Sequence, residues 1–203
     1  MTEPLASSFH AVRVSDLKPG EDTMVIGAGP IGLGVIAFLK YAGAGQIIVT
    51  EPVARRAQLA KKFGADYVFD PHKEPALQKK VMELTRGKGI DRLYQCSQNI
   101  KAFESGTSFI RRGGQIMVVD CIEEPVTIIP TLYCYCEWDM KGALCYNDDD
   151  YRATINSMGK HIVPFEEMVT KKIKLSDIVK EGFEILTQPD KGGEIKVLVQ
   201  PED

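Results

Sequence analysis

The sequence predicts an α/β fold in which a doubly wound parallel sheet is covered by helices on both faces. Strand-like apolar runs and helix-like segments alternate five times over about 100 residues, which is the pattern of successive βαβ units. A glycine-rich turn, Gly27-Ala28-Gly29-Pro30-Ile31-Gly32, joins the first strand to the helix after it. The chain of 203 residues is long enough for one sizeable core and a small second lobe.

The elements of this sheet follow one another in regular order. Helices are expected where apolar residues recur at three- and four-residue spacing, as at Ile31, Val35 and Leu39, and where Gly or Pro marks an end. Strands are expected where short apolar runs stand between turn residues. These rules predict helices at 4–15, 30–42, 53–63, 74–86 and 99–110, and strands at 23–27, 46–51, 67–69, 90–96 and 115–119.

Beyond residue 119 the alternation loosens. Apolar runs predict further strands, and a Ser-Asp cap at 176–177 predicts a helix start. We expect strands at 127–130, 139–145, 168–175 and 195–199, and helices at 149–159 and 176–186. The last 60 residues or so are too few to make an obvious domain of their own.

The spacing of Gly27, Gly29 and Gly32 is the G-x-G-x-x-G fingerprint of dinucleotide-binding Rossmann folds. Gly27 permits the tight turn out of the strand, Gly29 lets a pyrophosphate approach the backbone, and Gly32 lets the helix pack close to the sheet. Pro30 and Ile31 complete the turn where free N–H groups and the helix dipole attract phosphate. A glycine turn without a cofactor and a methyltransferase turn are the alternatives; the strand before it and the helix after it favour the dinucleotide.

An acidic residue stands at the distance that this fingerprint requires. Glu51 follows Gly32 by nineteen residues (51 − 32) and closes the second apolar run. Its carboxylate is expected to accept hydrogen bonds from the adenine-ribose hydroxyls and to favour NAD over NADP. A 2′-phosphate about 4 Å away would meet a repulsion of about 1–4 kcal/mol. Arg55 and Arg56 follow closely, and they either hold a phosphate or are solvated charges at a helix start.

Bulk composition excludes several classes of protein. A hydrophobic content of 44%, a charged content of 26% and a net charge of −3 are ordinary for a globular protein and favour neither nucleic acid nor an anionic membrane as a partner. No apolar run reaches the roughly 20 residues that span a bilayer, and Met1-Thr2-Glu3-Pro4 carries no basic region of a signal peptide. Five cysteines, four of them in strand-like or near-strand apolar context, favour a reduced cytoplasmic protein over a disulfide framework.

Seven short segments are spread along nearly the whole chain: Glu3-Pro4-Leu5-Ala6, His10-Ala11-Val12, Gly27 to Leu33, Phe63-Gly64-Ala65-Asp66, Arg112-Gly113-Gly114, Lys141-Gly142-Ala143-Leu144 and Asp177 to Glu184. In sequence and in order they resemble the medium-chain dehydrogenase/reductase superfamily, in its zinc-dependent alcohol and polyol dehydrogenase branch. The branch includes butanediol, sorbitol and threonine dehydrogenases.

The resemblance implies a function for this chain and a limit to it. Family members are longer and begin with a catalytic domain that supplies the Cys and His ligands of zinc. This chain resembles the cofactor half: an NAD-binding Rossmann domain with an N-terminal junction helix at 1–143, and a C-terminal segment at 144–203 that resembles the return part of the catalytic domain. It is therefore expected to be the NAD-binding portion of a dehydrogenase that passes hydride between a secondary alcohol and NAD. The alternative is a stand-alone dinucleotide-binding module without catalysis.

The resemblance also implies roles for single residues. Arg56 would lie near the adenosine, and the backbone at Val119 and Leu144 would contact the nicotinamide carboxamide. Glu3 would lie near the zinc only if the catalytic domain is present. Cys96 ends a strand, so it either lines the nicotinamide side of the crevice or packs in the core. No residue of this chain is expected to be catalytic.

Two further expectations concern metals and partners. Cys134-Tyr135-Cys136 has one intervening residue and no C-x-x-C pair exists, so zinc is expected in full-length family members and not in this chain. Residues 132–145 resemble the edge through which family members join two sheets, and Tyr133, Tyr135, Trp138 and Leu144 suit a buried edge. A homodimer through this edge is therefore expected, together with a small alcohol or polyol as the substrate.

Overall fold

A six-stranded parallel sheet forms the centre of the computed structural model, which describes residues 1–188 and 193–201. The strand order is β3-β2-β1-β4-β5-β6, the Rossmann order with its switch point between β1 and β4. This arrangement confirms the predicted fold class. The strands are β1 (Thr23–Ile26), β2 (Ile47–Thr50), β3 (Tyr67–Phe69), β4 (Ile90–Gln95), β5 (Ile110–Val118) and β6 (Asp139–Gly142).

Helices cover both faces of the sheet. Apolar residues of a strand point alternately to the two faces, so both faces must be covered. Val25 of β1 packs in the same core cluster as α1 (Thr2–Val14), α2 (Pro30–Tyr41) and α3 (Ala54–Phe63). Its neighbours Met24 and Ile26 point to the opposite cluster, with α4 (Leu77–Leu84) and α5 (Ile100–Gly106). None of the helices in the described ranges combines the length and the apolar character needed to cross a bilayer.

Close packing between α1 and α2 holds the start of α2 in position. A Cβ atom at Gly34 would overlap the Ser8 side chain, so the glycine lets the two helices approach. The Ser8 hydroxyl donates hydrogen bonds to the carbonyls of Pro4 and Ile31, each at 2.9 Å. The second bond ties α1 to the first turn of α2, which directly follows the glycine-rich turn.

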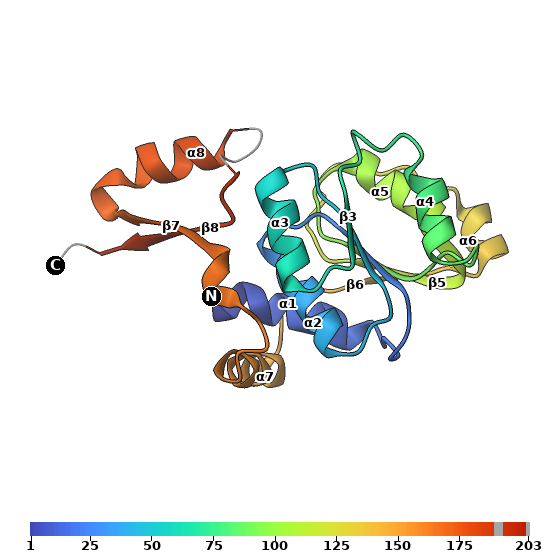
Figure 1. Ribbon diagram of the computed structural model, residues 1–203, viewed down its shortest axis with the longest axis horizontal. Coiled ribbons are helices and arrows are strands. Elements are labelled where there is room, and N and C mark those ends of the chain that lie inside the picture. Colours follow the sequence, from blue (N-terminus) through green and yellow to red (C-terminus); the bar gives the residue numbers. More distant parts are fainter. Residues whose placement is uncertain (189–192, 202–203) are drawn as a thin grey trace.

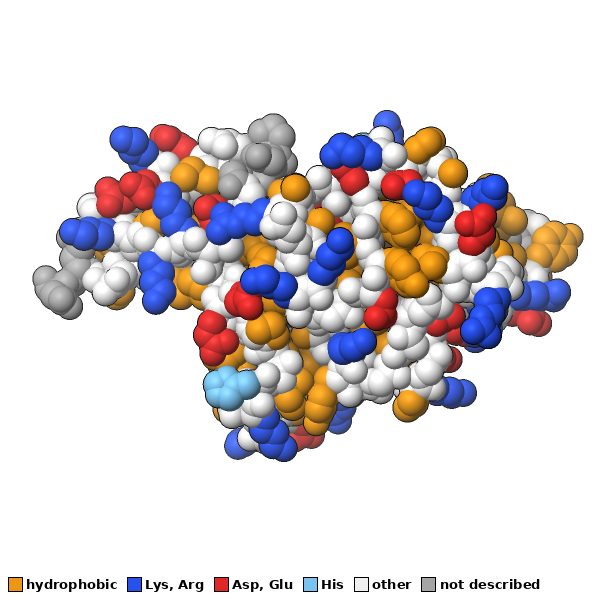
Figure 2. Space-filling view, in the orientation of Figure 1, with side chains coloured by type: hydrophobic (Ala, Val, Ile, Leu, Met, Phe, Trp, Pro, Cys, Tyr) orange, Lys and Arg blue, Asp and Glu red, His pale blue; other side chains and the backbone are white. Residues whose placement is uncertain are grey.

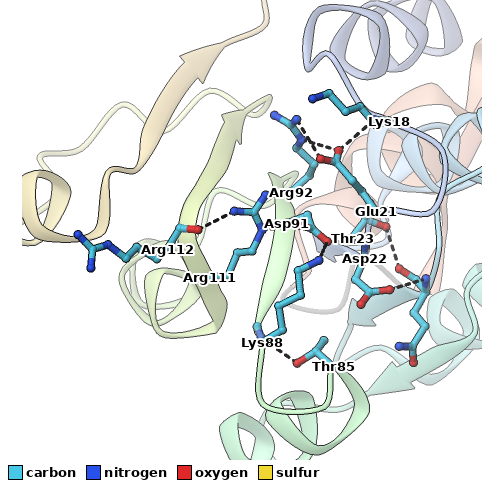
Figure 3. Close-up of polar contacts among 12 residues, drawn as sticks. Lys18, Glu21, Asp22, Thr23, Thr85, Lys88, Asp91, Arg92, Arg111 and Arg112 are labelled. Atoms are coloured by element: carbon cyan, nitrogen blue, oxygen red, sulfur yellow. Dashed lines mark hydrogen bonds and ion pairs between the residues drawn. The ribbon is translucent and has the colours of Figure 1, made fainter.

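A polar network closes the amino-terminal edge of the sheet (Figure 3). Asp91 of β4 accepts hydrogen bonds from Lys88 and Arg111, and the neighbouring Arg92 bonds Glu21 through its Nε at 2.9 Å. Burial alone would raise the pKa of the Asp91 carboxyl, but the hydrogen bonds from Lys88 and Arg111 outweigh it and the pKa is lowered. The network fixes this edge by ion pairs, and the opposite, carboxyl edge carries the loops of the candidate site.

The chain beyond β6 forms a helix against the Rossmann body and then a small lobe (Figure 1). α7 (Asp148–Gly159) packs on α1, and β7 (Val169–Lys174) pairs in parallel with β8 (Lys196–Gln200). Between these strands the chain passes through a 3₁₀ turn at Leu175–Asp177, a π-helical turn at Ile178–Phe183 and α8 (Glu184–Leu186). The lobe extends to one side of the body in Figure 2. The division at residue 143 stays a prediction.

Asp150 joins α7 to the body. Its buried carboxylate accepts hydrogen bonds from Arg13 at 2.8 Å and from the backbone N–H of Asn147 at 3.0 Å, and it lies 2.7 Å from His10 Nδ1. The Asn147 side chain accepts in turn from the Asp150 N–H, which completes a capping box at the start of α7. One carboxylate therefore both begins the helix and attaches it to α1.

Several expectations about residues 127–145 were wrong. The expected strand at 127–130 is absent from the described residues, and a helix, α6 (Pro130–Cys136), begins at Pro130 instead. Cys134 and Cys136 thus lie on a helix and not in strand-like context. The strand expected at 139–145 ends at Gly142. Tyr135 and Leu144 are 70% and 78% exposed in the single chain, and their burial at a homodimer edge stays a prediction.

Candidate nucleotide-binding site

The glycine turn has the geometry that its sequence predicts. Gly27 leaves β1 with a φ of +93°, and a Cβ there would lie 2.7 Å from the Cys96 carbonyl oxygen, so both the backbone and the space require glycine. A Cβ at Gly32 would overlap the Gly27 carbonyl oxygen. A Cβ at Gly29 meets nothing within 4 Å. The turn is therefore closed on its inner side and open above Gly29, where a pyrophosphate would approach.

The N-terminus of α2 faces the same opening. Gly29 is the N-cap and Pro30 occupies the first helical position, where its missing N–H costs nothing. The N–H groups of Ile31 and Gly32 are then the first that α2 can offer to a ligand. The first turn, Pro30-Ile31-Gly32-Leu33, is uncharged, so the positive end of the helix dipole is available to an anion.

Glu51 braces the turn from the end of β2. Its carboxylate, in a residue only 4% exposed, accepts the backbone N–H of Ala28 at Oε2 and that of Val53 at Oε1, each at 2.8 Å. A carboxylate oxygen has two lone pairs, so each oxygen retains one acceptor site for a ribose hydroxyl. The bracing role, which the sequence did not reveal, holds Glu51 in place before any ligand binds.

Two arginines of α3 contact the segment just before β8. Arg56 donates through Nη2 to the backbone carbonyl of Glu194 at 2.8 Å, and Arg55 Nη1 lies 3.5 Å from Glu194 Oε1. Arg56 Nε and Glu194 Oε2 are buried without a hydrogen-bond partner among the described residues. The expected place of Arg56 near an adenosine stays a prediction. Glu194 was missed, because no local signal connects it to α3 across 138 residues.

The residues expected on the nicotinamide side follow three adjacent strands. Cys96 lies buried beneath the glycine turn, and burial raises the pKa of its thiol, so it packs as a small apolar group. The N–H of Val119 donates to the Gln95 carbonyl at 3.1 Å. Leu144 lies two residues beyond β6 and its side chain is exposed. β4, β5 and β6 thus bring these residues to the edge that carries Gly27 and Glu51, where Rossmann folds bind ligands.

A surface hollow of about 610 Å³ lies beside the ends of β4 and β5 and continues this edge. It is lined by residues 98–101 at the start of α5 and by the loop at 121–124. Its polar lining includes Asn99, Lys101 and Glu124, and the exposed Cys121 lies at the loop.

The described residues of this chain do not form a zinc ligand set. Within the described ranges no group of three or more His, Cys, Asp or Glu side chains could hold a metal ion. Glu3 is exposed on the first turn of α1, and one carboxylate falls short of the three or four protein ligands that zinc requires. The glycine turn, the start of α2 and Glu51 together have the arrangement with which Rossmann folds bind and orient a dinucleotide.

Known proteins with similar sequences and structures include dehydrogenases and reductases. The chain is 32% identical over 202 residues to an (R,R)-butanediol dehydrogenase of Neisseria gonorrhoeae, covering 99% of the chain and 56% of that protein. The crystal structure of 2R,3R-butanediol dehydrogenase from Bacillus subtilis matches with a TM-score of 0.88 and 33% identity, over 99% of the chain and 56% of that structure. A zinc-binding dehydrogenase structure from Sinorhizobium meliloti, bound to NADP, matches with a TM-score of 0.86 and 25% identity, over 98% of the chain and 58% of that structure.

These matches cover only part of the length of each relative. The chain spans about half the length of the curated relatives it matches, and the matched part is their C-terminal half. The zinc-binding dehydrogenase family matches residues 30–160, which begin within the glycine turn at Pro30 and include α2, Glu51 and all strands from β2 to β6. The order of the sheet, the nucleotide-binding turn and this match agree: the chain belongs to the zinc-binding dehydrogenase family.

Proposed function

We propose that this chain binds NAD as the cofactor-binding portion of a zinc-dependent alcohol or polyol dehydrogenase. The observation that carries the proposal is the carboxylate of Glu51, held by two backbone N–H groups beside a turn that is open above Gly29. Bound NAD would supply the hydride acceptor for a secondary alcohol. The butanediol dehydrogenases among the relatives support a small alcohol or polyol as the substrate class.

The residues of this chain would bind and orient the cofactor. The N–H groups of Ile31 and Gly32 would hold the pyrophosphate, and Glu51 would accept the adenine-ribose hydroxyls. The backbone at Val119 and at Leu144 would position the nicotinamide carboxamide. No zinc step is assigned to these residues, because the described part of the chain does not supply a zinc ligand set.

Glu51→Ala should weaken NAD binding and reduce the preference for NAD over NADP. The substitution removes the ribose acceptors and the charge that repels a 2′-phosphate, a repulsion of about 1–4 kcal/mol at close range. Isothermal titration of the unmodified chain and the variant with NAD and with NADP measures both affinities.

The matched control is Glu83→Ala, which removes an exposed carboxylate on α4 that pairs with Lys79 at the surface. This variant should retain the NAD affinity and the NAD preference. Equal affinities of the unmodified chain for NAD and NADP would contradict the role given to Glu51, and absence of NAD binding would contradict the proposed function.

Hydride transfer is tested by fusing this chain to the N-terminal half of a relative, which the present chain does not match. A fusion with the N-terminal half of the Bacillus subtilis butanediol dehydrogenase should oxidise 2,3-butanediol with NAD and zinc, monitored as NADH absorbance. The chain alone, assayed with 2,3-butanediol, sorbitol and threonine, should be inactive. NAD binding without activity in either form would favour the stand-alone dinucleotide-binding module.

We also propose a homodimer through the free edge of the sheet. β6 is the edge strand, so its outer N–H and C=O groups are open to a second strand. Exposed apolar side chains flank it on α6 and the preceding loop, namely Ile128, Ile129, Leu132 and Tyr135, with Met140 on the strand itself. A twofold axis would place two such edges antiparallel and cover this apolar surface.

Sedimentation velocity should therefore show a dimer that Tyr135→Glu converts to a monomer, since the added charge would be buried at the interface. Tyr41→Glu is the matched control, because Tyr41 is 60% exposed on α2, away from β6. A monomeric unmodified chain at high concentration would contradict this assembly.

We assign the protein to the cytoplasm. All five cysteines lie in the described residues and are free, and three of them, Cys121, Cys134 and Cys145, are exposed. Exposed free thiols are typical of a reducing compartment.

A further inference from the structure

We propose that Glu194 is a second determinant of NAD preference, because it engages Arg55 and Arg56 and withholds them from a 2′-phosphate. This inference rests on the proposed function, since it concerns the adenosine end of the same site. In Rossmann folds, an acid after the second strand selects NAD, and an arginine nearby accommodates the 2′-phosphate of NADP. The chain carries the acid, Glu51, and two arginines, Arg55 and Arg56. Whether the arginines can bind a 2′-phosphate therefore depends on what else they contact.

The arginines lie close to Glu51 in the chain and at the start of the next helix. Glu51 bonds the N–H of Val53, and α3 begins one residue later with Arg55 and Arg56 in its first turn. Helical side chains lean toward the N-terminus of their helix, here toward the Glu51 loop. A guanidinium at this position suits bidentate binding of a phosphate.

Glu194 contacts the guanidinium groups of both Arg55 and Arg56. Its backbone carbonyl accepts from Arg56 Nη2 at 2.8 Å, and its carboxylate Oε1 lies 3.5 Å from Arg55 Nη1. The Glu194 side chain is only 14% exposed, whereas the Arg55 side chain is 48% exposed. The carboxylate is therefore held within the protein, and Arg55 reaches it from the surface.

The position of Glu194 is fixed by its neighbours in the chain. Ile195 is 5% exposed and belongs to the main core cluster, and its N–H donates to Thr170 Oγ1 at 3.0 Å. On the other side, a Cβ at Gly193 would lie 3.6 Å from Arg55 Cδ, so the Arg55 stem packs on the backbone there. The contact is thus part of the packing that joins β8 to α3.

The charges at this end of the site balance. Glu51 and Glu194 supply two negative charges, and Arg55 and Arg56 supply two positive ones. A 2′-phosphate would have to displace Glu194 from Arg55 to gain an ion pair, and it would still face Glu51. The neutral hydroxyl of NAD needs no such exchange. Removing the Glu194 charge should therefore benefit NADP and leave NAD unaffected.

The test is the ratio of NADP to NAD affinity in Glu194→Gln, measured by isothermal titration on the full chain. The isosteric amide retains the backbone contact to Arg56 and frees Arg55. NADP should bind about three- to fivefold more tightly, the range expected for a partly exposed charge pair, with NAD affinity within twofold of the unmodified chain. Adding Arg55→Ala to Glu194→Gln should abolish this gain.

Glu184→Gln, an exposed glutamate on α8, is the matched charge control and should leave both affinities unchanged. A Glu194→Gln chain that binds NAD normally with an unaltered ratio overturns the inference and leaves the proposed function standing. Equal losses of NAD and NADP affinity with a lower melting temperature also overturn it, because they assign Glu194 a purely structural role. Failure of the unmodified chain to bind NAD overturns the proposed function itself.

Discussion

Gly32→Ala should unfold the glycine turn locally and remove most of the affinity for NAD. The added Cβ would overlap the carbonyl oxygen of Gly27, a backbone atom that is held because Gly27 N–H bonds Thr50 at 2.9 Å. Overpacking of this kind costs about 1–3 kcal/mol of stability. A similar loss of binding free energy would raise the Kd for NAD by about five- to 150-fold. Thermal denaturation and NAD titration of the same sample measure the two effects.

Two other glycines separate the loss of stability from the loss of binding. Gly29→Ala adds a methyl group where the protein has open space, so the melting temperature should stay unchanged while the methyl group obstructs the pyrophosphate and weakens NAD binding. The methyl group added by Gly159→Ala, at the end of α7, also lies in open space. This variant should change neither the melting temperature nor the affinity for NAD. An unaltered melting temperature in Gly32→Ala would contradict the overlap at Gly27.

Asp150→Ala should strongly destabilise the protein. It removes the acceptor shared by Arg13 and His10, which attach α7 to α1, and by the Asn147 N–H, which caps the start of α7. Hydrogen bonds to a buried charge contribute about 1.5–3 kcal/mol each before compensation. Because Arg13 is half-exposed and can be solvated after the change, we expect a net loss of about 2–4 kcal/mol. At about 2–4 °C per kcal/mol, the melting temperature should fall by roughly 4–16 °C.

The same substitution should lose its effect in acid. Burial alone would raise the pKa of Asp150, but hydrogen bonds from the Asn147 N–H, His10 and Arg13 outweigh it, and the pKa in the folded state is lowered. The stabilisation is therefore complete above the unfolded pKa of about 3.9 and disappears as the pH falls through the folded value. Urea unfolding of both chains at pH 7, 5 and 3 should show the difference between them shrinking only in the most acidic sample. Asp149→Ala, an exposed neighbour in the same turn, is the control that should change little at any pH.

Local patterns were sufficient to predict most of the body of the fold. The three glycines, the apolar strand before them and the acid at residue 51 each follow from short-range chemistry, and the structure places all of them at one edge of the sheet. Alternating burial of Met24, Val25 and Ile26 is likewise a local property of a strand covered on both faces. The ends of α4 and α5 were less accurately predicted. Turns replace the outer residues expected for α4, and a 3₁₀ turn at Thr107–Phe109 replaces the last residues expected for α5.

Long-range contacts and proline chemistry account for what the sequence did not reveal. The run Thr127-Ile128-Ile129 is β-branched, but Pro130 favours the first position of a helix, and α6 begins there. The partners of Asp150 lie 137 and 140 residues away, and those of Arg56 lie 138 away. Such pairings depend on how elements pack, and a single sequence contains no period or spacing that encodes them.

The buried thiol of Cys96 provides an internal reporter of how often the nucleotide-binding turn opens. Its raised pKa and its place beneath Gly27 and Gly32 protect it from reagents while the turn is closed. The rate at which this cysteine is modified, with the exposed cysteines already blocked, therefore measures local opening of the turn. A ligand bound to the turn should slow the modification of Cys96. Cofactor occupancy can therefore be followed by the rate of this modification, without an assay of enzyme activity.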